Sequence, residues 1–202
     1  MNFNEVKTTA VVGAGNIGHG IALTLGLAGY EVRLNSTNDA SLQKGMDFIK
    51  ADLDRLVRLD MPKPEAALAN ISTTTSLDEA SRDCDVVIEA VYENAELKQQ
   101  IFRDLDAFCP ERTILVSNTL TIIPSRFAEV AQRPDRVLVT HYTGPAYVSP
   151  LVEIVRTEQI SDETVDIMFQ ALKKSGKRPV IIQKEVPGFT AIRLEVAIAR
   201  EA

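Results

Sequence analysis

The 202-residue sequence is short of the residues on which several classes of protein depend. It contains no tryptophan, 2 cysteines and 2 histidines, and aromatic residues make up only 5 %. Because Cys84 and Cys109 show neither a CxxC pair nor another metal-ligand spacing, we expect no disulfide framework and no metal site. The sequence instead predicts two reduced, structural thiols in a cytoplasmic protein.

An excess of positive charge and long apolar runs are also lacking. The 22 Lys and Arg residues are outnumbered by 28 Asp and Glu residues, so the net charge is −6. Neutralising phosphate groups needs a basic surface, and we therefore expect no nucleic-acid or anionic-membrane partner. No apolar run approaches the roughly 18 residues of a membrane-spanning helix, and the N-terminus shows no signal-peptide pattern. The remaining composition, 45 % apolar and 25 % charged, is typical of a globular protein.

Short β-branched runs alternate with helical patterns along most of the chain. The expected strands are Thr8–Val12, Tyr30–Asn35, Ile71–Thr74, Val86–Val91, Thr113–Ser117, Val137–His141, Leu151–Val155 and Val180–Gln183. The expected helices are Asn16–Ala28, Ala40 to about Leu59, Glu96–Phe108, Pro124–Ala131 and Asp162–Lys174. This alternation is typical of βαβ units, so the sequence predicts an α/β fold of the Rossmann type, a doubly wound and mainly parallel sheet.

A glycine-rich turn follows the first expected strand and opens the first expected helix. Gly13, Gly15 and Gly18 form the pattern G-x-G-x-x-G, with Asn16 and Ile17 before the third glycine. The first glycine permits a tight turn, the second lets a pyrophosphate approach the backbone, and the third lets the helix pack closely on the strand. The free N–H groups of the helix then face the phosphates. We therefore expect a dinucleotide cofactor at this turn, bound by these five residues.

The acidic residue that usually follows about 20 residues later is replaced by Asn35, at the end of the second expected strand. A carboxylate there accepts hydrogen bonds from the adenosine ribose and repels a 2′-phosphate. An amide does the first weakly and the second not at all, so the sequence leaves both NAD and NADP open. The absence of an arginine just after Asn35 favours NAD.

One of the two histidines lies where a ligand of this fold would bind. His141 ends an expected strand, and α/β folds bind ligands beyond the carboxyl ends of their strands. Alternation within Leu151–Val155 places Glu153 on one face with apolar side chains, where an unpaired carboxylate is costly. A histidine partner would remove that cost and fix the tautomer of the imidazole. His19, in the first turn of the first helix, is expected to be a solvated or capping side chain.

Further segments follow one another in a characteristic order. They are Asp85–Asn94 with Lys98 and Phe102, Ser117–Thr119, His141, Pro150–Val155, Gly176–Val180 and Pro187–Phe189. With the glycine-rich turn, they make the sequence closely resemble the L-3-hydroxyacyl-CoA dehydrogenase family over nearly all of its length. Residues 146–150 and the ending Arg193–Ala202 resemble the lambda-crystallin and L-gulonate dehydrogenase branch more closely.

The resemblance implies an activity. Members use a nicotinamide cofactor, NAD, to oxidise a 3-hydroxyacyl-CoA or a small L-3-hydroxy acid to the 3-keto compound by hydride transfer, a reaction of fatty acid metabolism. It also implies that His141 is the base that removes the hydroxyl proton, while Glu153 orients it and stabilises the imidazolium. We expect Glu153→Gln to cost less activity than His141→Ala, because glutamine keeps a hydrogen bond.

The resemblance further implies a cofactor site. The three glycines of the turn hold the pyrophosphate, and Asn35 takes the ribose position. The ribose and nicotinamide side is lined by Ala90, Glu93, Lys98 and Asn118.

Three positions depart from the pattern of the family. Leu120 stands where a serine usually binds the substrate hydroxyl, and the neighbouring Thr121 is expected to point away in a strand-like segment. Gly144 replaces an asparagine beside the nicotinamide, and Ile192 replaces a further catalytic asparagine. Losing one oriented donor typically costs about a hundredfold in rate. The alternative function is therefore a non-catalytic dinucleotide-binding protein, or a truncated, weakly active relic of the enzyme.

The substrate is also left open by the charges of the second expected helix. Lys44, Lys50, Arg55 and Arg58 are balanced by Asp47, Asp52, Asp54 and Asp60. The helix therefore offers no net positive face for the phosphates of coenzyme A, which favours a smaller hydroxy acid.

The resemblance divides the chain into two parts. Residues 1–186 correspond to the dinucleotide-binding Rossmann domain, and residues 187–202 to a linker and the first helix of an otherwise missing helical domain. The apolar stripe of this helix consists of Phe189, Ile192, Val196 and Ala199, widened by Leu194 and Ile198. The stripe could be covered by the chain's own sheet, if the helix folds back, or by the same helix of a second chain. We favour the second arrangement, which predicts a homodimer.

Overall fold

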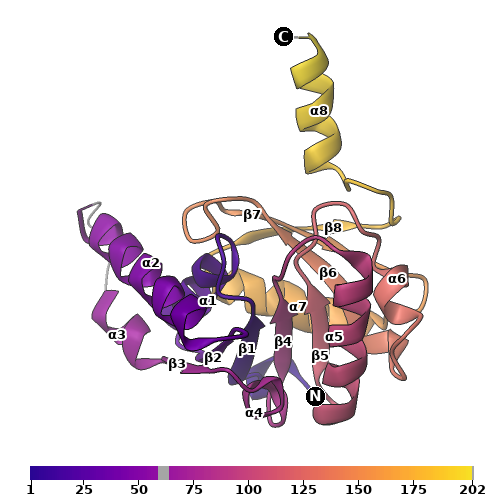
Figure 1. The fold of residues 1–202 in the computed structure, drawn as a ribbon. Helices are drawn as coiled ribbons and strands as arrows, with labels where there is room; N and C mark the ends of the chain where they lie inside the picture. Colours follow the sequence, from indigo (N-terminus) through magenta and orange to yellow (C-terminus); the bar gives the residue numbers. More distant parts are fainter. Residues whose placement is uncertain (59–63, 202) are drawn as a thin grey trace.

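The computed structural model describes residues 1–58 and 64–201, which form one sheet of eight strands with helices on both faces (Figure 1). The strands are β1 (Thr8–Val12), β2 (Glu31–Asn35), β3 (Ile71–Thr74), β4 (Val86–Glu89), β5 (Ile114–Ser117), β6 (Val137–Tyr142), β7 (Leu151–Val155) and β8 (Arg178–Ile182). Their spatial order is β3-β2-β1-β4-β5-β6-β7-β8. The strands from β1 to β6 run parallel, β7 is antiparallel to β6, and β8 is parallel to β7. The predicted mainly parallel Rossmann-type sheet is confirmed.

The helices follow the predicted order, with short additions. They are η1 (Phe3–Glu5), α1 (Gly18–Leu27), α2 (Asp39–Arg58), α3 (Pro64–Ala69), α4 (Leu77–Ser81), α5 (Ala95–Phe108), α6 (Ser125–Ala128), η2 (Pro134–Arg136), α7 (Asp162–Lys174) and α8 (Ala191–Glu201). The helices α3 and α4 were not predicted, because segments this short show no helical period. The predicted end of the second helix at Leu59 lies outside the described residues.

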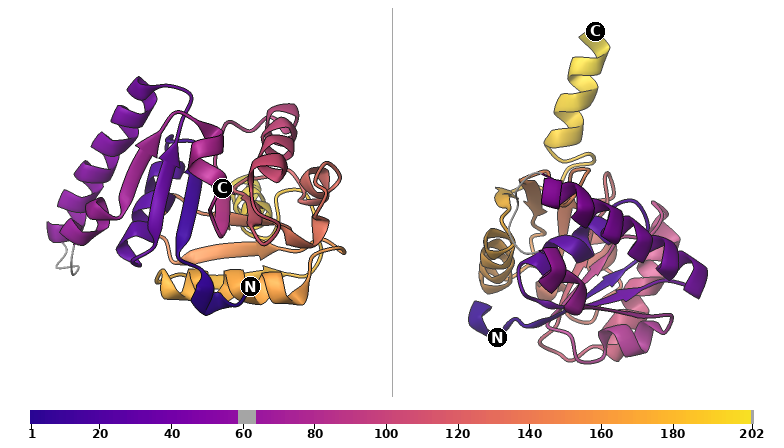
Figure 2. Two further views of the ribbon diagram at one scale, coloured as in Figure 1. Left: turned by 90° about the horizontal axis from the view of Figure 1, so that it is seen from below. Right: turned by 90° about the vertical axis from the view of Figure 1, so that its left-hand side faces the viewer.

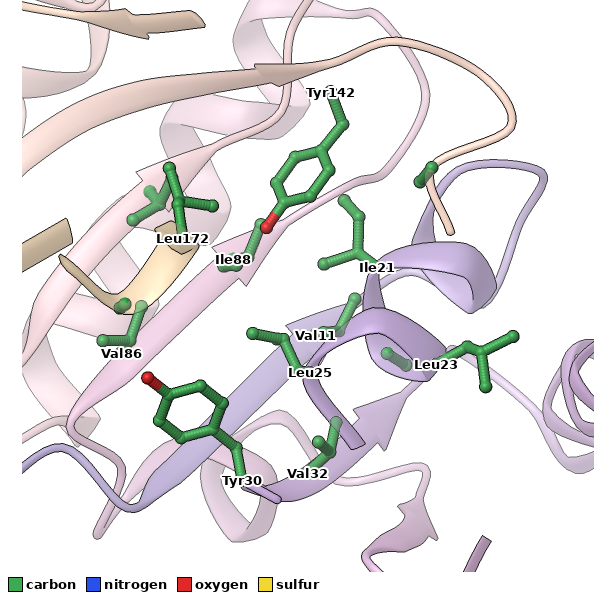
Figure 3. Close-up of a cluster of buried hydrophobic side chains, with 14 of the residues drawn as sticks. Val11, Ile21, Leu23, Leu25, Tyr30, Val32, Val86, Ile88, Tyr142 and Leu172 are labelled. Atoms are coloured by element: carbon green, nitrogen blue, oxygen red, sulfur yellow. The ribbon is translucent and has the colours of Figure 1, made fainter. Parts of the chain in front are cut away.

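Helices cover both faces of the sheet (Figure 2), and an apolar core lies on each face. The side chain of Val11 faces the core under α1, α2, α3 and α7, whereas its neighbour Val12 faces the core under α4, α5 and α6. The first core brings Ile21 of α1 and Leu172 of α7 over Ile88 of β4 (Figure 3). Because strands buried on both faces must be apolar at every position, the near-continuous apolar runs of the sequence fit the centre of this sheet.

Polar caps start the helices that return the chain to the sheet. Oδ1 of Asn94 accepts a hydrogen bond from the N–H of Leu97 at 2.9 Å and starts α5. Oγ of Ser161 does the same for α7, accepting from Thr164 at 3.1 Å. Since α5 begins just beyond β4, its first turn brings Lys98 back to the carboxyl edge of the strands.

The helix α8 extends away from the sheet, as Figure 1 and the right view of Figure 2 show. Its side chains Leu194, Val196 and Ile198 are 58 %, 44 % and 70 % exposed. The predicted apolar stripe is wrong at Phe189, which precedes α8 and is buried in the core under α5 and α6. Its φ of +47° follows a φ of +77° at Gly188, and this left-handed turn separates the ring from the helix.

Candidate cofactor and catalytic site

The glycine-rich turn joins β1 to α1 at the carboxyl edge of the parallel strands. Gly13 has a φ of +110°, and a Cβ there would lie 2.6 Å from the carbonyl oxygen of Ala90. A Cβ at Gly18 would lie 1.7 Å from the carbonyl oxygen of Gly13, so this close approach requires glycine. A Cβ at Gly15 would meet nothing within 4 Å. The turn is therefore closed at Gly13 and Gly18 and open in front of Gly15, as a pyrophosphate requires.

Asn35 ends β2 beside this turn. Its carbonyl oxygen accepts a hydrogen bond from the N–H of Gly13 at 2.9 Å. Its side chain is buried, and Nδ2 donates to the carbonyl oxygen of Thr74 at 3.0 Å. The amide group is thus oriented by β3 through its nitrogen, and its oxygen is an acceptor.

A buried ion network holds the loops beyond β4 and β5. Nζ of Lys98, fully buried, lies 2.7 Å from Oε1 of Glu89 and 3.6 Å from Oε2 of Glu93. Oε2 of Glu89 also accepts from Oγ of Ser117 at 2.7 Å. Each charge is tolerated because the others compensate for its lost hydration. Sequence reasoning missed Glu89, although a carboxylate inside the apolar run Val86–Val91 indicates the need for a buried cation.

Glu93 binds the segment that follows β5. Its Oε1 accepts from the hydroxyl groups of Thr119 and Thr121 and from the backbone N–H groups of Leu120 and Thr121. Burial by itself raises the pKa of Glu93, but the Thr119 hydrogen bond and the charge of Lys98 outweigh it and lower the pKa below its usual value. The expectation that Thr121 continues a strand is wrong, because β5 ends at Ser117 and Glu93 turns the chain.

Asn118 connects the ends of three strands. Its N–H donates to the carbonyl oxygen of Glu89 at 2.7 Å, and its Oδ1 accepts from the N–H of Tyr142 at 2.9 Å. The side chain therefore lies between the ends of β4 and β6, beside His141.

His141 and Glu153 face each other directly in the antiparallel register of β6 and β7. Nδ1 of His141 lies 2.8 Å from Oε2 of Glu153, and both side chains are buried. Because a carboxylate only accepts hydrogen bonds, the proton of the neutral ring lies on Nδ1 and the lone pair on Nε2. This geometry leaves Nε2 as a proton acceptor at the carboxyl end of β6.

The second oxygen of Glu153 holds the start of the C-terminal helix. Oε1 accepts from the N–H groups of Thr190 at 2.9 Å and Ala191 at 3.0 Å. The ring centre of Phe189 lies 5.8 Å from that of His141. Glu153 is thus fixed by three partners, and the imidazole contacts both Glu153 and Phe189.

The three departures from the family pattern lie on three different segments. Leu120 is 45 % exposed, and its N–H is bound to Glu93. A Cβ at Gly144 would come within 3.4 Å of Cδ1 of Ile17, so the loop after β6 lies against the glycine-rich turn. Ile192 lies in the first turn of α8, beyond the residues that Glu153 binds.

The expectation for His19 is wrong. Its side chain is only 11 % exposed, and both ring nitrogens have partners on the glycine-rich turn and on α2. The position of His19 in the first turn of a helix did not indicate its burial or its partners, because Asp52 is 33 residues away.

The two cysteines and the possible metal ligands in the described part of the chain form no second reactive or metal site. Cys84 and Cys109 are free and buried, and burial raises the pKa of Cys84 to about 12 and that of Cys109 to about 11. Within residues 1–58 and 64–201, no cluster of three or more His, Cys, Asp or Glu side chains could hold a metal ion. No helix in the same part of the chain is long and apolar enough to cross a membrane.

Comparison with known proteins identifies relatives of this arrangement. The pattern of the family described as "3-hydroxyacyl-CoA dehydrogenase, NAD binding domain" matches residues 8–186. The peroxisomal fatty acid beta-oxidation multifunctional protein MFP2 of Arabidopsis thaliana is 41 % identical over 180 residues, which cover 88 % of this chain and 25 % of that protein. A probable 3-hydroxybutyryl-CoA dehydrogenase of Bacillus subtilis is 36 % identical over 202 residues, covering 98 % of this chain and 69 % of that protein.

A solved structure agrees. The (S)-3-hydroxybutyryl-CoA dehydrogenase PaaH1 from Ralstonia eutropha superposes with a TM-score of 0.92 at 34 % identity, covering 98 % of this chain and 70 % of that one. The chain thus spans about a quarter of the length of multifunctional relatives such as MFP2 and over two thirds of the shorter ones. The chain belongs to the 3-hydroxyacyl-CoA dehydrogenase family and comprises the family's NAD-binding domain.

Proposed function

We propose that this chain binds NAD and supplies the proton acceptor of a 3-hydroxyacyl-CoA dehydrogenase, acting on a 3-hydroxyacyl-CoA or a small L-3-hydroxy acid. The observation that carries the proposal is the buried His141–Glu153 pair, which lies at the same sheet edge as the open turn at Gly15. Ligands of such sheets bind at the carboxyl ends of the strands. The relatives named 3-hydroxybutyryl-CoA dehydrogenase support the reaction class.

The reaction divides between the cofactor and two side chains. NAD, when bound, supplies the acceptor for the hydride that leaves C3 of the substrate. Nε2 of His141 takes the hydroxyl proton as the carbonyl group forms. The imidazolium then donates through Nδ1 to Glu153, whose negative charge stabilises it. Lys98, Glu93 and Asn118 fix the loops that border the ribose and nicotinamide side.

A second candidate function is dinucleotide binding without turnover. Leu120, Gly144 and Ile192 supply no side-chain donor where the family pattern has serine or asparagine. Each oriented donor is typically worth about a hundredfold in rate. The cofactor site does not depend on these three side chains, so binding would persist.

Turnover assays separate the two functions. The protein is incubated with NAD and either L-3-hydroxybutyryl-CoA or free L-3-hydroxybutyrate, and NADH formation is followed. We expect oxidation of at least one L substrate and none of its D enantiomer, since one fixed base serves one face of the carbon. NADH binding without turnover of either L substrate would select the non-catalytic function.

We propose that Asn35 sets the preference between NAD and NADP. In Asn35→Asp a carboxylate replaces the amide, repels a 2′-phosphate and is expected to raise the NAD-over-NADP affinity ratio about tenfold, roughly 1.4 kcal/mol. The bond to Thr74 is lost as well, and Asn35→Ala controls for this because it loses the same bond without adding charge. Fluorescence titration with NADH and NADPH measures the ratio. An equal ratio in all three proteins would show that residue 35 does not face the ribose.

We propose that a second copy of the chain covers α8, giving a homodimer. Val196 and Ile198 are exposed apolar side chains on a helix that extends away from the sheet, and such surface favours association. Sedimentation at micromolar concentration should show a dimer, and Val196→Asp with Ile198→Asp should convert it to monomer. Glu195→Lys, a charge change on the same helix, should leave the dimer intact. A monomeric wild-type protein would contradict the proposal.

The cytoplasmic location stays a prediction. The plant relatives carry peroxisomal and glyoxysomal names, whereas other relatives are bacterial.

A further inference from the structure

A second buried histidine network lies behind the glycine-rich turn. Nδ1 of His19 lies 2.7 Å from the carbonyl oxygen of Gly15, and Nε2 lies 3.1 Å from Oδ2 of Asp52 on α2. Oδ1 of Asp52 accepts from Nη1 of Arg55 at 2.6 Å and from the hydroxyl group of Tyr147 at 2.8 Å. The network therefore joins the turn to α2 and to the loop between β6 and β7.

The partners of His19 determine its charge. A backbone carbonyl can only accept a hydrogen bond, so Nδ1 must carry a proton. Asp52 receives donors from Arg55 and Tyr147 on its other oxygen, and both favour the ionised carboxylate, which also only accepts. Burial and the charge of Asp52 raise the pKa of Tyr147, so its hydroxyl group stays protonated and donates. Both ring nitrogens of His19 therefore face acceptors, and satisfying both requires two ring protons.

Among the described residues, Asp52 is the carboxylate that pairs with the ring of His19. Asp52 is shared between His19 and Arg55, and α1 carries no other ionisable side chain. On the remaining side, the ring of Phe48 lies 5.1 Å from that of His19, and Nζ of Lys44 lies 5.6 Å from the Phe48 ring. Asp52 thus serves both His19 and Arg55, and Lys44 lies beyond the Phe48 ring.

We propose that His19 is a positioning residue for the cofactor: an imidazolium, doubly protonated at pH 7, that fixes the carbonyl of Gly15 and adds positive charge behind the pyrophosphate. The proposal rests on the cofactor site proposed above. His19 does not act on the substrate, so its effect is on the affinity for the dinucleotide and not on the proton transfer at His141.

The charge of the ring can be measured without any cofactor. The sequence has only 2 histidines, so His141→Asn leaves His19 as the single source of imidazole signals. The ¹⁵N NMR spectrum of this variant at pH 7 should show that both ring nitrogens of His19 are protonated. Asp52→Asn, added to the same variant, should shift the ring to the neutral form. A neutral His19 at pH 7 with Asp52 intact would overturn the proposal.

The contribution to binding is measured by NADH fluorescence in the same single-histidine background. His19→Gln keeps a donor for the carbonyl of Gly15 but carries no charge, and it should bind NADH about tenfold more weakly. The affinity of the His19 protein should fall above the pH at which NMR shows loss of the ring proton, whereas His19→Gln should show no such fall. Equal affinities, or the same pH profile in both proteins, would overturn the proposal.

The two proposals fail separately. If Gly15→Val leaves NADH binding unchanged, the cofactor site is wrong, while the charge of His19 is still decided by NMR. If Gly15→Val abolishes binding and His19→Gln does not weaken it, the cofactor site stands and the positioning role of His19 is wrong.

Discussion

Replacing Gly15 by valine is expected to weaken NADH binding at least about a hundredfold, roughly 2.7 kcal/mol, while the protein stays folded. A Cβ at this position meets no atom within 4 Å, so space in the protein is open where the side chain begins. The branched side chain instead fills the open space that a pyrophosphate needs in order to reach the N–H groups of α1. The loss should therefore appear in the affinity for the cofactor and not in stability.

Fluorescence titration with NADH measures the affinity, and thermal unfolding measures the stability. Gly15→Ala is the graded control, and it should bind NADH with an affinity between those of the valine variant and the wild type. Gly18→Ala is the opposite case, because its Cβ would lie 1.7 Å from the carbonyl oxygen of Gly13 and should lower the unfolding temperature. Wild-type affinity in Gly15→Val would rule out the glycine-rich turn as the cofactor site.

Replacing His141 by alanine is expected to lower kcat about a thousandfold for any L-3-hydroxy substrate that the protein oxidises. The side chain is the proposed proton acceptor, and both ring nitrogens of the other histidine, His19, already have partners on Gly15 and Asp52. Steady-state kinetics at saturating NAD measure the loss of kcat. NADH affinity should change little, because His141 does not contact the glycine-rich turn. His141→Asn checks for misfolding, since it keeps a donor for Glu153. Activity that survives both substitutions would exclude His141 as the base.

The structure reverses the expectation for Glu153→Gln. Oε1 of Glu153 accepts from Thr190 and Ala191, so the single oxygen of a glutamine is held by these two donors. Its amide group then donates to Nδ1 of His141 and forces the ring proton onto Nε2, which can no longer accept. We therefore expect a loss close to that of His141→Ala, by the wrong tautomer. A mild loss would show that the glutamine turns its oxygen toward His141.

Local patterns in the sequence were sufficient for most of the fold. The β-branched runs and the glycine-rich turn depend on neighbours within a few residues, and β1, β3, β7 and α7 begin and end where they were predicted. The short helices α3 and α4 were missed because they contain too few residues for a period. The expectation of a strand-like segment around Thr121 was wrong because Glu93, distant in sequence, binds the chain there.

The sequence by itself determined the parallel sheet, the position of the glycine-rich turn and the candidates His141 and Glu153, because each depends on spacing along one segment. Only the tertiary structure decided the contacts between segments. The antiparallel register of β6 and β7 places His141 opposite Glu153, and the packing of α2 on α1 brings Asp52 to His19. Neither register nor helix packing is encoded at short range, since both follow from burying whole faces of strands and helices at once. Phe189 is buried beside His141 and does not belong to the predicted apolar stripe, and its burial has the same cause.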